Sequence, residues 1–394
     1  MTENTNKQTS PKPLVSDGLN LPKLLASLKV TVVCLVILAI LVVWGTVYQA
    51  EHGLYQAQQK FFHSWVFFIF GFIPFPGTVT IMFLLFINLV FSLIFRIRFR
   101  LANIGNVLTH LGIIILLVGG FFTFYYAEES SLMLKEGEQS QMSSSNHLWE
   151  LAIWEEKGNE KEVYAVDTKG FSSGKNLSFQ ELGVRLNVTA YYSNCSVSDV
   201  PTQPVINGSG IRNLQTEPTA TEVSDNTAGL VADIGSYAGN QIMGRLLLFG
   251  QEDAPTLVTV DGRSYGVILR RKKIPLPLSI FLKDFKVKMY PNSAIPKSYE
   301  SVVKILEADG VARDVVISMN KPLRFKDLTF FQSSYYIAPD GTEYSIFAVV
   351  KNVGRLLPYV SSITIFLGLL IHFLAMMIRR RKMNKNSSAT PLEI

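Results

Sequence analysis

Residues Asn106 to Phe122 read NVLTHLGIIILLVGGFF. This run is apolar and is nearly as long as the roughly 20 residues that a membrane-spanning helix requires. His110 interrupts it with a titratable imidazole. Because an ionisable side chain inside hydrocarbon is unfavourable unless its nitrogens are satisfied, His110 is a functional candidate.

Three further runs resemble this one. The four predicted spans cover residues 28–48, 78–95, 104–124 and 357–378. The first is predicted to be a retained anchor, since its apolar core is long and no small-residue cleavage site follows it. The sequence therefore predicts a polytopic α-helical membrane protein with three N-terminal transmembrane helices and one C-terminal helix.

Basic residues predict the orientation of these spans. They cluster before the first span, between the second and third, and after the fourth, as Lys12, Lys23 and Lys29; Arg96, Arg98 and Arg100; and Arg379 to Lys382. Such clusters favour the cytoplasmic side. We therefore expect a cytoplasmic tail at 1–27, a basic cytoplasmic tail at 379–394, and outer segments at 49–77 and 125–356.

The first outer segment, 49–77, is rich in aromatic residues. It contains KFFHSWVFFIFGFIPFPG, in which Gly71, Pro74 and Pro76 prevent one continuous helix. We expect Trp65 to Phe72 to lie in the membrane interface as an amphipathic or re-entrant piece. An extended start to the second span is the alternative.

The second outer segment, 125–356, has a different periodicity. Short runs such as LVTV, FKVKMY and EYSIFAVV are rich in β-branched and aromatic residues, and Asp261-Gly262 and Asp340-Gly341 mark turns. This pattern predicts a large all-β extracytoplasmic domain. The polar stretch from Cys195 to Gly229 is predicted to be a surface excursion.

Composition excludes several function classes. The chain has 394 residues, 48% of them hydrophobic and 17% charged, with a net charge of +6. Because the basic residues lie beside apolar runs, they favour contact with the lipid bilayer and not with nucleic acid. The two cysteines, Cys34 and Cys195, form no CxxC or CxxCH motif, and no nucleotide-binding or hydrolase signature is present.

Two intramembrane histidines lie at comparable predicted depth. At about 1.5 Å per residue, His110 lies about 15 Å from Arg100, and His372 lies about 10 Å from Arg379. Together they could ligate a metal or the two axial positions of a haem. Alternatively, each donates to a polar group on a neighbouring helix, and His372 could reach the headgroups.

The remaining histidines are weaker candidates. His52 and His63 fall in the first outer loop, where they could contact a ligand leaving the membrane or simply be solvated. His147 opens a predicted strand and is treated as an ordinary surface residue.

Small and polar residues in the spans predict helix packing. Gly112 and Gly119 are one heptad apart on the third span and permit close approach of another helix, on a stripe that His110 does not share. Asn88 in the second span could orient a histidine or pair helices.

Several motifs together resemble the ResB family of the system II cytochrome c biogenesis machinery. In the spans these are LKVTVVCLVILAILVVWGTVYQ, FFHSWVFFIF, FINLVFSLIFRIR and THLGIIILLVGG. In the outer segment they are PLPLSIFLKDFKVKMYPNSAIPKSYES and NKPLRFKDLTFFQSSY, which are the most specific.

The resemblance implies a function in haem delivery. ResB-like proteins work with a ResC/CcsA-like membrane protein, and the pair moves haem b outward and attaches it to CxxCH cysteines of apocytochrome c. Thiol-reducing proteins of the same pathway keep those cysteines free. The expected location is the cell inner (plasma) membrane.

The resemblance also implies site residues. His110 in THLG matches the family's axial haem ligand, so its only expected contact with a metal is through haem iron. Because no tryptophan-rich haem motif occurs here, the partner is expected to be a separate chain, and the family pattern takes the second ligand from that partner and not from His372. The chain would then be a non-catalytic or co-catalytic subunit of a holocytochrome c synthase.

Two other function classes remain open on the sequence. A b-type haem or quinone-linked electron-transfer subunit would use His110 and His372 as an internal pair. A sensor or assembly scaffold would use no cofactor, and His110 would then be dispensable.

Overall fold

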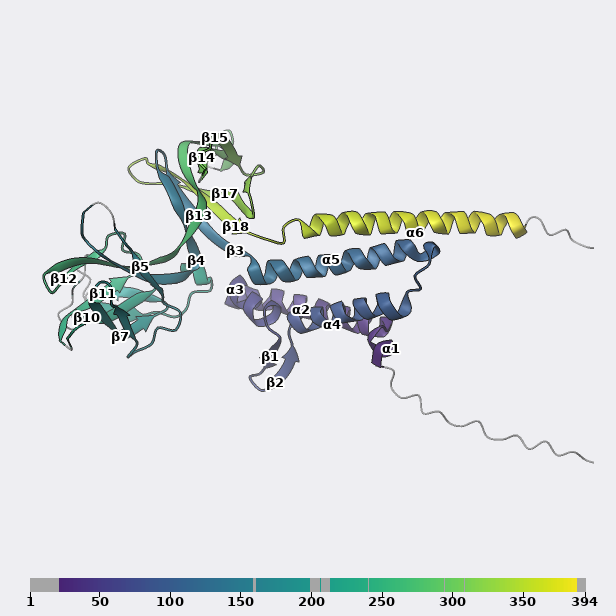
Figure 1. The fold of residues 1–394 in the computed structure, drawn as a ribbon, viewed down its shortest axis with the longest axis horizontal. Coiled ribbons are helices and arrows are strands. Elements are labelled where there is room, and N and C mark those ends of the chain that lie inside the picture. The colour runs from purple at the N-terminus through teal and green to yellow at the C-terminus, as the bar shows by residue number, and fades with distance from the viewer. Residues whose placement is uncertain are drawn as a thin grey trace, which may run out of the picture. The chain divides into compact units, whose positions relative to one another are not determined.

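The chain forms two compact units in the computed structural model shown in Figure 1. The structure describes residues 21–158, 161–198, 206, 213–239, 241–293, 295–307 and 309–387. The first unit comprises Met1–Val47, Gln58–Phe121 and Leu356–Ile394, and the second comprises Tyr48–Ala57 and Phe122–Arg355.

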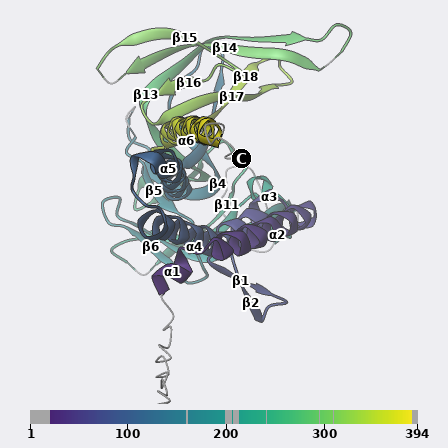
Figure 2. The ribbon, with the colours of Figure 1, turned by 90° about the vertical axis from the view of Figure 1, so that its right-hand side faces the viewer.

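Four helices are long and apolar enough to cross a membrane, as predicted. They are α2 (Leu28–His52), α4 (Thr78–Phe91) with its π-helical continuation η2 (Ser92–Arg96), α5 (Ile104–Tyr126) and α6 (Leu357–Ser387). They run side by side in Figures 1 and 2. The short helices α1 (Leu21–Leu25) and η3 (Leu101–Asn103) precede α2 and α5.

The helix boundaries have local causes. Ser27 caps α2, since the backbone nitrogen of Lys29 donates to its Oγ at 3.2 Å. At its other end α2 continues past residue 48 to His52, which therefore lies on the helix and not in the following loop. The helix α6 continues past residue 378 through its basic residues, because arginine and lysine are good helix formers.

The predicted interfacial piece is a β-hairpin. After α3 (Leu54–Ala57) and the π-helical turn η1 (Gln58–Phe62), strands β1 (Val66–Ile69) and β2 (Ile73–Pro76) pair antiparallel. Two prolines are tolerated in β2 because this sheet has only two strands, so each strand leaves one edge unpaired. The second span therefore starts at Thr78. The alternative, in which Trp65 to Phe72 form an extended start to this span, does not match the structure.

The second unit is built from β strands, which confirms the predicted fold class. A four-stranded sheet has the order β11-β10-β7-β6, a ten-stranded sheet has the path β15-β14-β13-β4-β3-β18-β17-β16 with β12 and β5 at its side, and β8 pairs with β9. The bounds are β3 (Glu128–Lys135), β4 (Gln139–Glu155), β5 (Tyr164–Asp167), β6 (Asn176–Phe179), β7 (Val184–Tyr192), β8 (Cys195–Ser198), β9 (Asn213–Thr216), β10 (Gly229–Ser236), β11 (Ile242–Phe249), β12 (Thr256–Val260), β13 (Arg263–Met289), β14 (Pro296–Glu307), β15 (Ala312–Ser318), β16 (Leu323–Phe325), β17 (Leu328–Ile337) and β18 (Glu343–Lys351).

Two large hydrophobic cores stabilise this unit, in addition to smaller clusters of buried residues. The first, which includes Leu151, Leu230 and Val267, lies between the four-stranded sheet and one part of the ten-stranded sheet. The second, which includes Leu134, Ile280 and Phe347, lies within the other part. The long strands β4 and β13 pair along much of their length and connect the two regions, as Figure 1 shows.

The predicted surface excursion from Cys195 to Gly229 contains regular structure. Strands β8 and β9 pair antiparallel, and the short helix η4 (Val223–Asp225) follows them. Residues 199–205 and 207–212 lie outside the described part of the chain.

Candidate functional site

A cavity of about 800 Å³ lies within the helical unit. Helices α2, α4 and α5, the turn η2 and the connection between η2 and α5 form its walls. Its lining residues are Leu28, Thr31, Leu35, Leu85, Asn88, Leu89, Ser92, Arg96, Ile97, Arg98, Asn103, Asn106, His110, Ile113 and Leu117. A volume of this size is typical of sites for organic ligands and cofactors.

His110 lies in this cavity, and its ring is oriented by its own helix. Its Nδ1 lies 2.8 Å from the backbone oxygen of Asn106, one turn earlier in α5. Because a carbonyl oxygen can only accept, Nδ1 is the donor in this contact, and in the neutral ring this leaves the lone pair on Nε2. An imidazole held in this way can present Nε2 to a metal ion or to haem iron.

Polar side chains belong to eight of the fifteen described lining residues, which are Thr31, Asn88, Ser92, Arg96, Arg98, Asn103, Asn106 and His110. Two exposed arginines also line the cavity: Arg96 is the last residue of η2, and Arg98 lies in the connection between η2 and α5. Among the described lining residues there is no Asp or Glu. The exposed surface of the wall is nevertheless mainly apolar, and with two guanidinium groups and one imidazole it suits a largely hydrophobic ligand that carries carboxylates.

Asn88 fixes the wall formed by α2 and α4. Its side chain is 3% exposed. It accepts from Thr31 Oγ1 at 2.6 Å and donates to the backbone oxygen of Ser27 at 3.0 Å. The Ser92 hydroxyl donates to the Ala26 oxygen at 3.2 Å. Asn88 therefore pairs helices, which was one of its two predicted roles, and it also lines the cavity.

A different face of α5 packs against α6. A Cβ on Gly112 would lie 2.6 Å from Ile365 Cγ1, and one on Gly119 would lie 2.7 Å from Leu357 Cβ. Ser361 Oγ also donates to the Gly112 oxygen at 2.8 Å. The predicted glycine stripe thus permits close helix packing, while His110 uses another face.

His372 lies on α6 beside the same stripe. Its backbone nitrogen would be 2.5 Å from a Cβ on Gly105. Its ring lies 5.8 Å from that of Phe373, and His372 is not among the described residues that line the cavity. The structure therefore brings His110 into the cavity without His372.

The other histidines have local partners. The ring of His52 stacks on Tyr48 at 3.9 Å, and its Nδ1 lies 3.3 Å from the Tyr48 oxygen. The Nδ1 of His63 lies 3.4 Å from Gln59 Nε2, and burial lowers the pKa of His63.

His147 lies inside β4 and does not open it. Its ring lies 4.9 Å from that of Tyr55. The pKa of His147 is lowered, first by burial and then by the positive charge of Arg271.

The described part of the chain contains no group of three or more His, Cys, Asp or Glu residues that could hold a metal ion. Cys34 and Cys195 are both free and buried. Burial raises the pKa of Cys195 to about 11, which keeps this thiol protonated near neutral pH.

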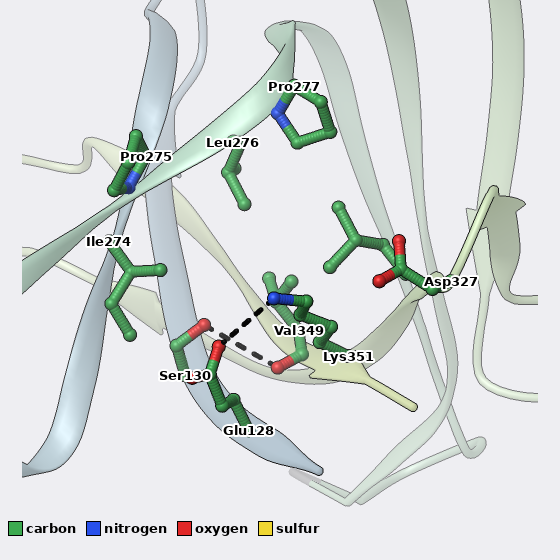
Figure 3. A pocket seen from close by; sticks show the side chains of 10 residues that line it. Glu128, Ser130, Ile274, Pro275, Leu276, Pro277, Asp327, Val349 and Lys351 are labelled. Atoms are coloured by element: carbon green, nitrogen blue, oxygen red, sulfur yellow. Dashed lines mark hydrogen bonds and ion pairs between the residues drawn. The ribbon is translucent and has the colours of Figure 1, made fainter. Parts of the chain in front are cut away.

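A second cavity, of about 410 Å³, lies in the β unit (Figure 3). Its wall includes Pro275 to Pro277, where the register between β13 and β4 shifts. The Glu128–Lys351 ion pair of 3.6 Å lies at this cavity, with Leu276 and Val349 among its apolar lining. No histidine or cysteine occurs among its described lining residues, so it lacks an obvious haem ligand.

Sequence reasoning missed Arg96, Arg98, Asn103 and Asn106 as site residues. The two arginines had been interpreted only as determinants of orientation. Their position, directly before the helix that carries His110, was the available signal. Asn106 precedes His110 by one helical turn, the spacing at which a histidine can donate to a backbone carbonyl.

Comparison with known proteins supports the resemblance. Residues 227–342 match the model of the ResB-like family. Protein NrfI of Wolinella succinogenes is 36% identical over 104 residues, which are 26% of this chain and 11% of NrfI. The cytochrome c biogenesis protein Ccs1 of Heterosigma akashiwo is 43% identical over 58 residues, 14% of each chain.

The matched segments thus span well under two thirds of these relatives. The ResB-like match includes the two most specific motifs of the sequence, at residues 275–301 and 320–335. The predicted resemblance is therefore confirmed, and this membrane protein is ResB-like over residues 227–342.

Proposed function

We propose that this chain is the ResB-like subunit of a cytochrome c maturation system and that it holds haem b in the cavity beside His110. The matched relatives support the biological process, since one carries cytochrome c biogenesis in its name. The single observation that carries the site is the His110 imidazole in a large, mainly apolar cavity, with Nδ1 occupied by the Asn106 carbonyl.

Haem is the cargo in this proposal, and the lining residues fit its chemistry. Its macrocycle is planar and apolar, which suits side chains such as Leu35, Leu85 and Leu117. Its two propionates are anionic, which suits Arg96 and Arg98. His110 would supply one axial nitrogen through Nε2.

The remaining requirements are assigned to partners. A ResC/CcsA-like membrane protein would supply the second axial ligand, and apocytochrome c would receive the haem on its CxxCH cysteines. Thiol-reducing proteins of the pathway would keep those cysteines reduced, because both cysteines of this chain are buried. The chain would act in the plasma membrane as a subunit of the synthase, with both termini cytoplasmic and the β unit outside.

A single-chain electron-transfer subunit is the second candidate. It would require His110 and His372 to ligate one haem. The cavity favours the first candidate, because His372 is not among its described lining residues.

The decisive experiment compares His110→Ala with the matched variant His372→Ala. Each would be co-expressed with a ResC/CcsA-like partner and a CxxCH reporter, with covalent haem on the reporter measured by in-gel peroxidase activity. The purified complexes would be compared by their haem absorbance per protein.

We expect His110→Ala to lose most bound haem and most reporter maturation, and His372→Ala to retain both. Wild-type maturation in His110→Ala would refute the ligand assignment. Equal losses in both variants, with each protein present at normal level, would favour the internal pair.

A further inference from the structure

The β1–β2 hairpin is an uncharged, aromatic projection of the helical unit. From Ser64 to Gly77 the sequence is SWVFFIFGFIPFPG, with no Asp, Glu, Lys or Arg. Its turn contains Phe70 and Gly71 with φ of 53° and 81°. In Figure 1 it extends sideways from α2 and α4, across the direction of the helices.

One face of the hairpin is attached to the bundle. Phe67 and Phe75 are opposite each other in the register, and their rings lie 5.7 and 6.2 Å from that of Trp44. Phe67 is 5% exposed. The Gly77 nitrogen also donates to the Trp65 oxygen at 2.8 Å, which closes the base of the hairpin directly before α4. These contacts give the hairpin a fixed position on the helices.

The turn and the opposite face have no cover within the described chain. Phe68, Phe70 and Phe72 are 57%, 86% and 71% exposed. Exposed aromatic side chains in such a cluster mark a surface that meets another apolar phase or a partner.

The combined length of α4 and η2 gives the depth of the hairpin in the membrane. Thr78–Arg96 has 19 residues, which corresponds to about 28 Å at about 1.5 Å per residue. The hydrocarbon core of a bilayer is about 30 Å thick. With Arg96 at one interface, the base of the hairpin therefore lies at the opposite interface.

The headgroup region of the bilayer suits the exposed aromatic side chains, the unpaired strand edges and the interfacial position of the hairpin base. In water the three phenylalanines would stay hydrated, and in the hydrocarbon core the unpaired backbone groups of both strands would lack partners. The interface offers apolar contact for aromatic rings and hydrogen bonds for the backbone. We propose that the tip Phe70–Phe72 inserts into the outer headgroup interface and anchors the helical unit laterally, independently of haem.

Depth measurement by spin labelling tests this anchor. Single cysteines at Phe70 or Phe72 would be introduced into the full chain with Cys34→Ala and Cys195→Ala, because the native cysteines are buried. After reconstitution in phosphatidylcholine nanodiscs, collisions of the label with oxygen and with a water-soluble nickel chelate would be compared. Val311→Cys, which replaces an exposed residue of the β unit (51%), serves as the water-exposed control.

We expect labels at residues 70 and 72 to collide with oxygen at least about threefold more, relative to nickel, than the label at 311. Nickel accessibility equal to that of Val311→Cys would overturn the anchor, since the tip would then lie in water. Shielding from both reagents would also overturn it, since protein would then cover the tip.

A charge at the tip provides a second test. Phe70→Asp, with the label kept at residue 72, is expected to move that label toward the nickel reagent. Phe70→Leu should leave its depth unchanged. An unchanged depth in Phe70→Asp would contradict insertion.

Discussion

A hydrogen bond within α5 explains how His110 can lie in an apolar helix. Its Nδ1 donates to the Asn106 oxygen at 2.8 Å, so one ring nitrogen is satisfied without any partner chain. Backbone carbonyl acceptors are common partners of metal-ligating histidines because they fix the tautomer. The bond is therefore compatible with His110 as a helix-packing residue and with His110 as a haem ligand. The position of His110 in the cavity favours the ligand role.

A comparison of Arg98 with Arg100 tests whether the basic cluster contacts the proposed haem in addition to setting membrane orientation. Both are exposed residues of one basic cluster, but only Arg98 is among the described residues that line the cavity. We expect Arg98→Ala to weaken haem retention roughly 10-fold or more, because a hydrogen bond to a charged group contributes about 1.5–3 kcal/mol. Haem absorbance of the purified complex measures this.

Arg100→Ala is the matched control, since it removes one charge from the same connection. It is expected to retain haem. Equal loss of haem in both variants would assign the effect to the charge of the cluster and not to contact with propionates.

The thiol of Cys195 is expected to react slowly with alkylating reagents in the folded protein. With a pKa of about 11, only about 0.1% of this group is thiolate at pH 8 by the Henderson–Hasselbalch relation. In a Cys34→Ala background, maleimide should label Cys195 far more slowly than a cysteine placed at Leu257, which is 61% exposed. Denaturation should accelerate the reaction more than about 100-fold. Comparable native rates at both positions would show that Cys195 is accessible.

At the scale of elements, the packing of α5 on α6 depends on glycine. A Cβ on Gly112 would lie 2.6 Å from Ile365 Cγ1 and 3.0 Å from the Ile365 nitrogen, whereas one on Gly120 would meet nothing within 4 Å. We expect Gly112→Val to lower the melting temperature in detergent by roughly 5 °C, because overpacking costs about 1–3 kcal/mol. Tryptophan fluorescence during heating measures it.

Gly120→Val controls for the helix propensity of valine in the same helix. Its melting temperature should stay within about 2 °C of the wild type. Similar losses in the two variants would mean that close approach of α6 does not depend on Gly112.

The sequence predicted some elements well because their signals are local. Long apolar runs predicted four spans, and heptad spacing of Gly112 and Gly119 predicted a packing face. The hairpin was missed because its conformation depends on Phe67 and Phe75 packing against Trp44, a contact between distant segments. Arg96 and Arg98 were missed as site residues for the same reason, since only the folded bundle places them with His110.

At the scale of the whole molecule, the two units have different physical bases. Helices in the first unit expose many large apolar side chains, such as Val43 and Phe366, which lipid would cover. The second unit instead buries many of its apolar residues in two large cores of its own. A chain of this kind requires a membrane for one part and an aqueous compartment for the other.

Charge asymmetry predicts which compartment holds the β unit. The arginines between the second and third spans, and those after the fourth, should keep these segments cytoplasmic. In a Cys34→Ala, Cys195→Ala background, Leu101→Cys and Val311→Cys replace residues that are 90% and 51% exposed. We expect a membrane-impermeant maleimide added to intact cells lacking an outer membrane barrier to label Val311→Cys and not Leu101→Cys.

Permeabilised cells should show labelling of both variants, which controls for thiol reactivity. The opposite pattern in intact cells would reverse the orientation and would place Arg96, Arg98 and the nearby end of the cavity on the outer side. Haem arriving from the cytoplasm would then meet the hairpin end of the bundle first, so the labelling pattern also tests the direction of haem movement that the proposed function requires.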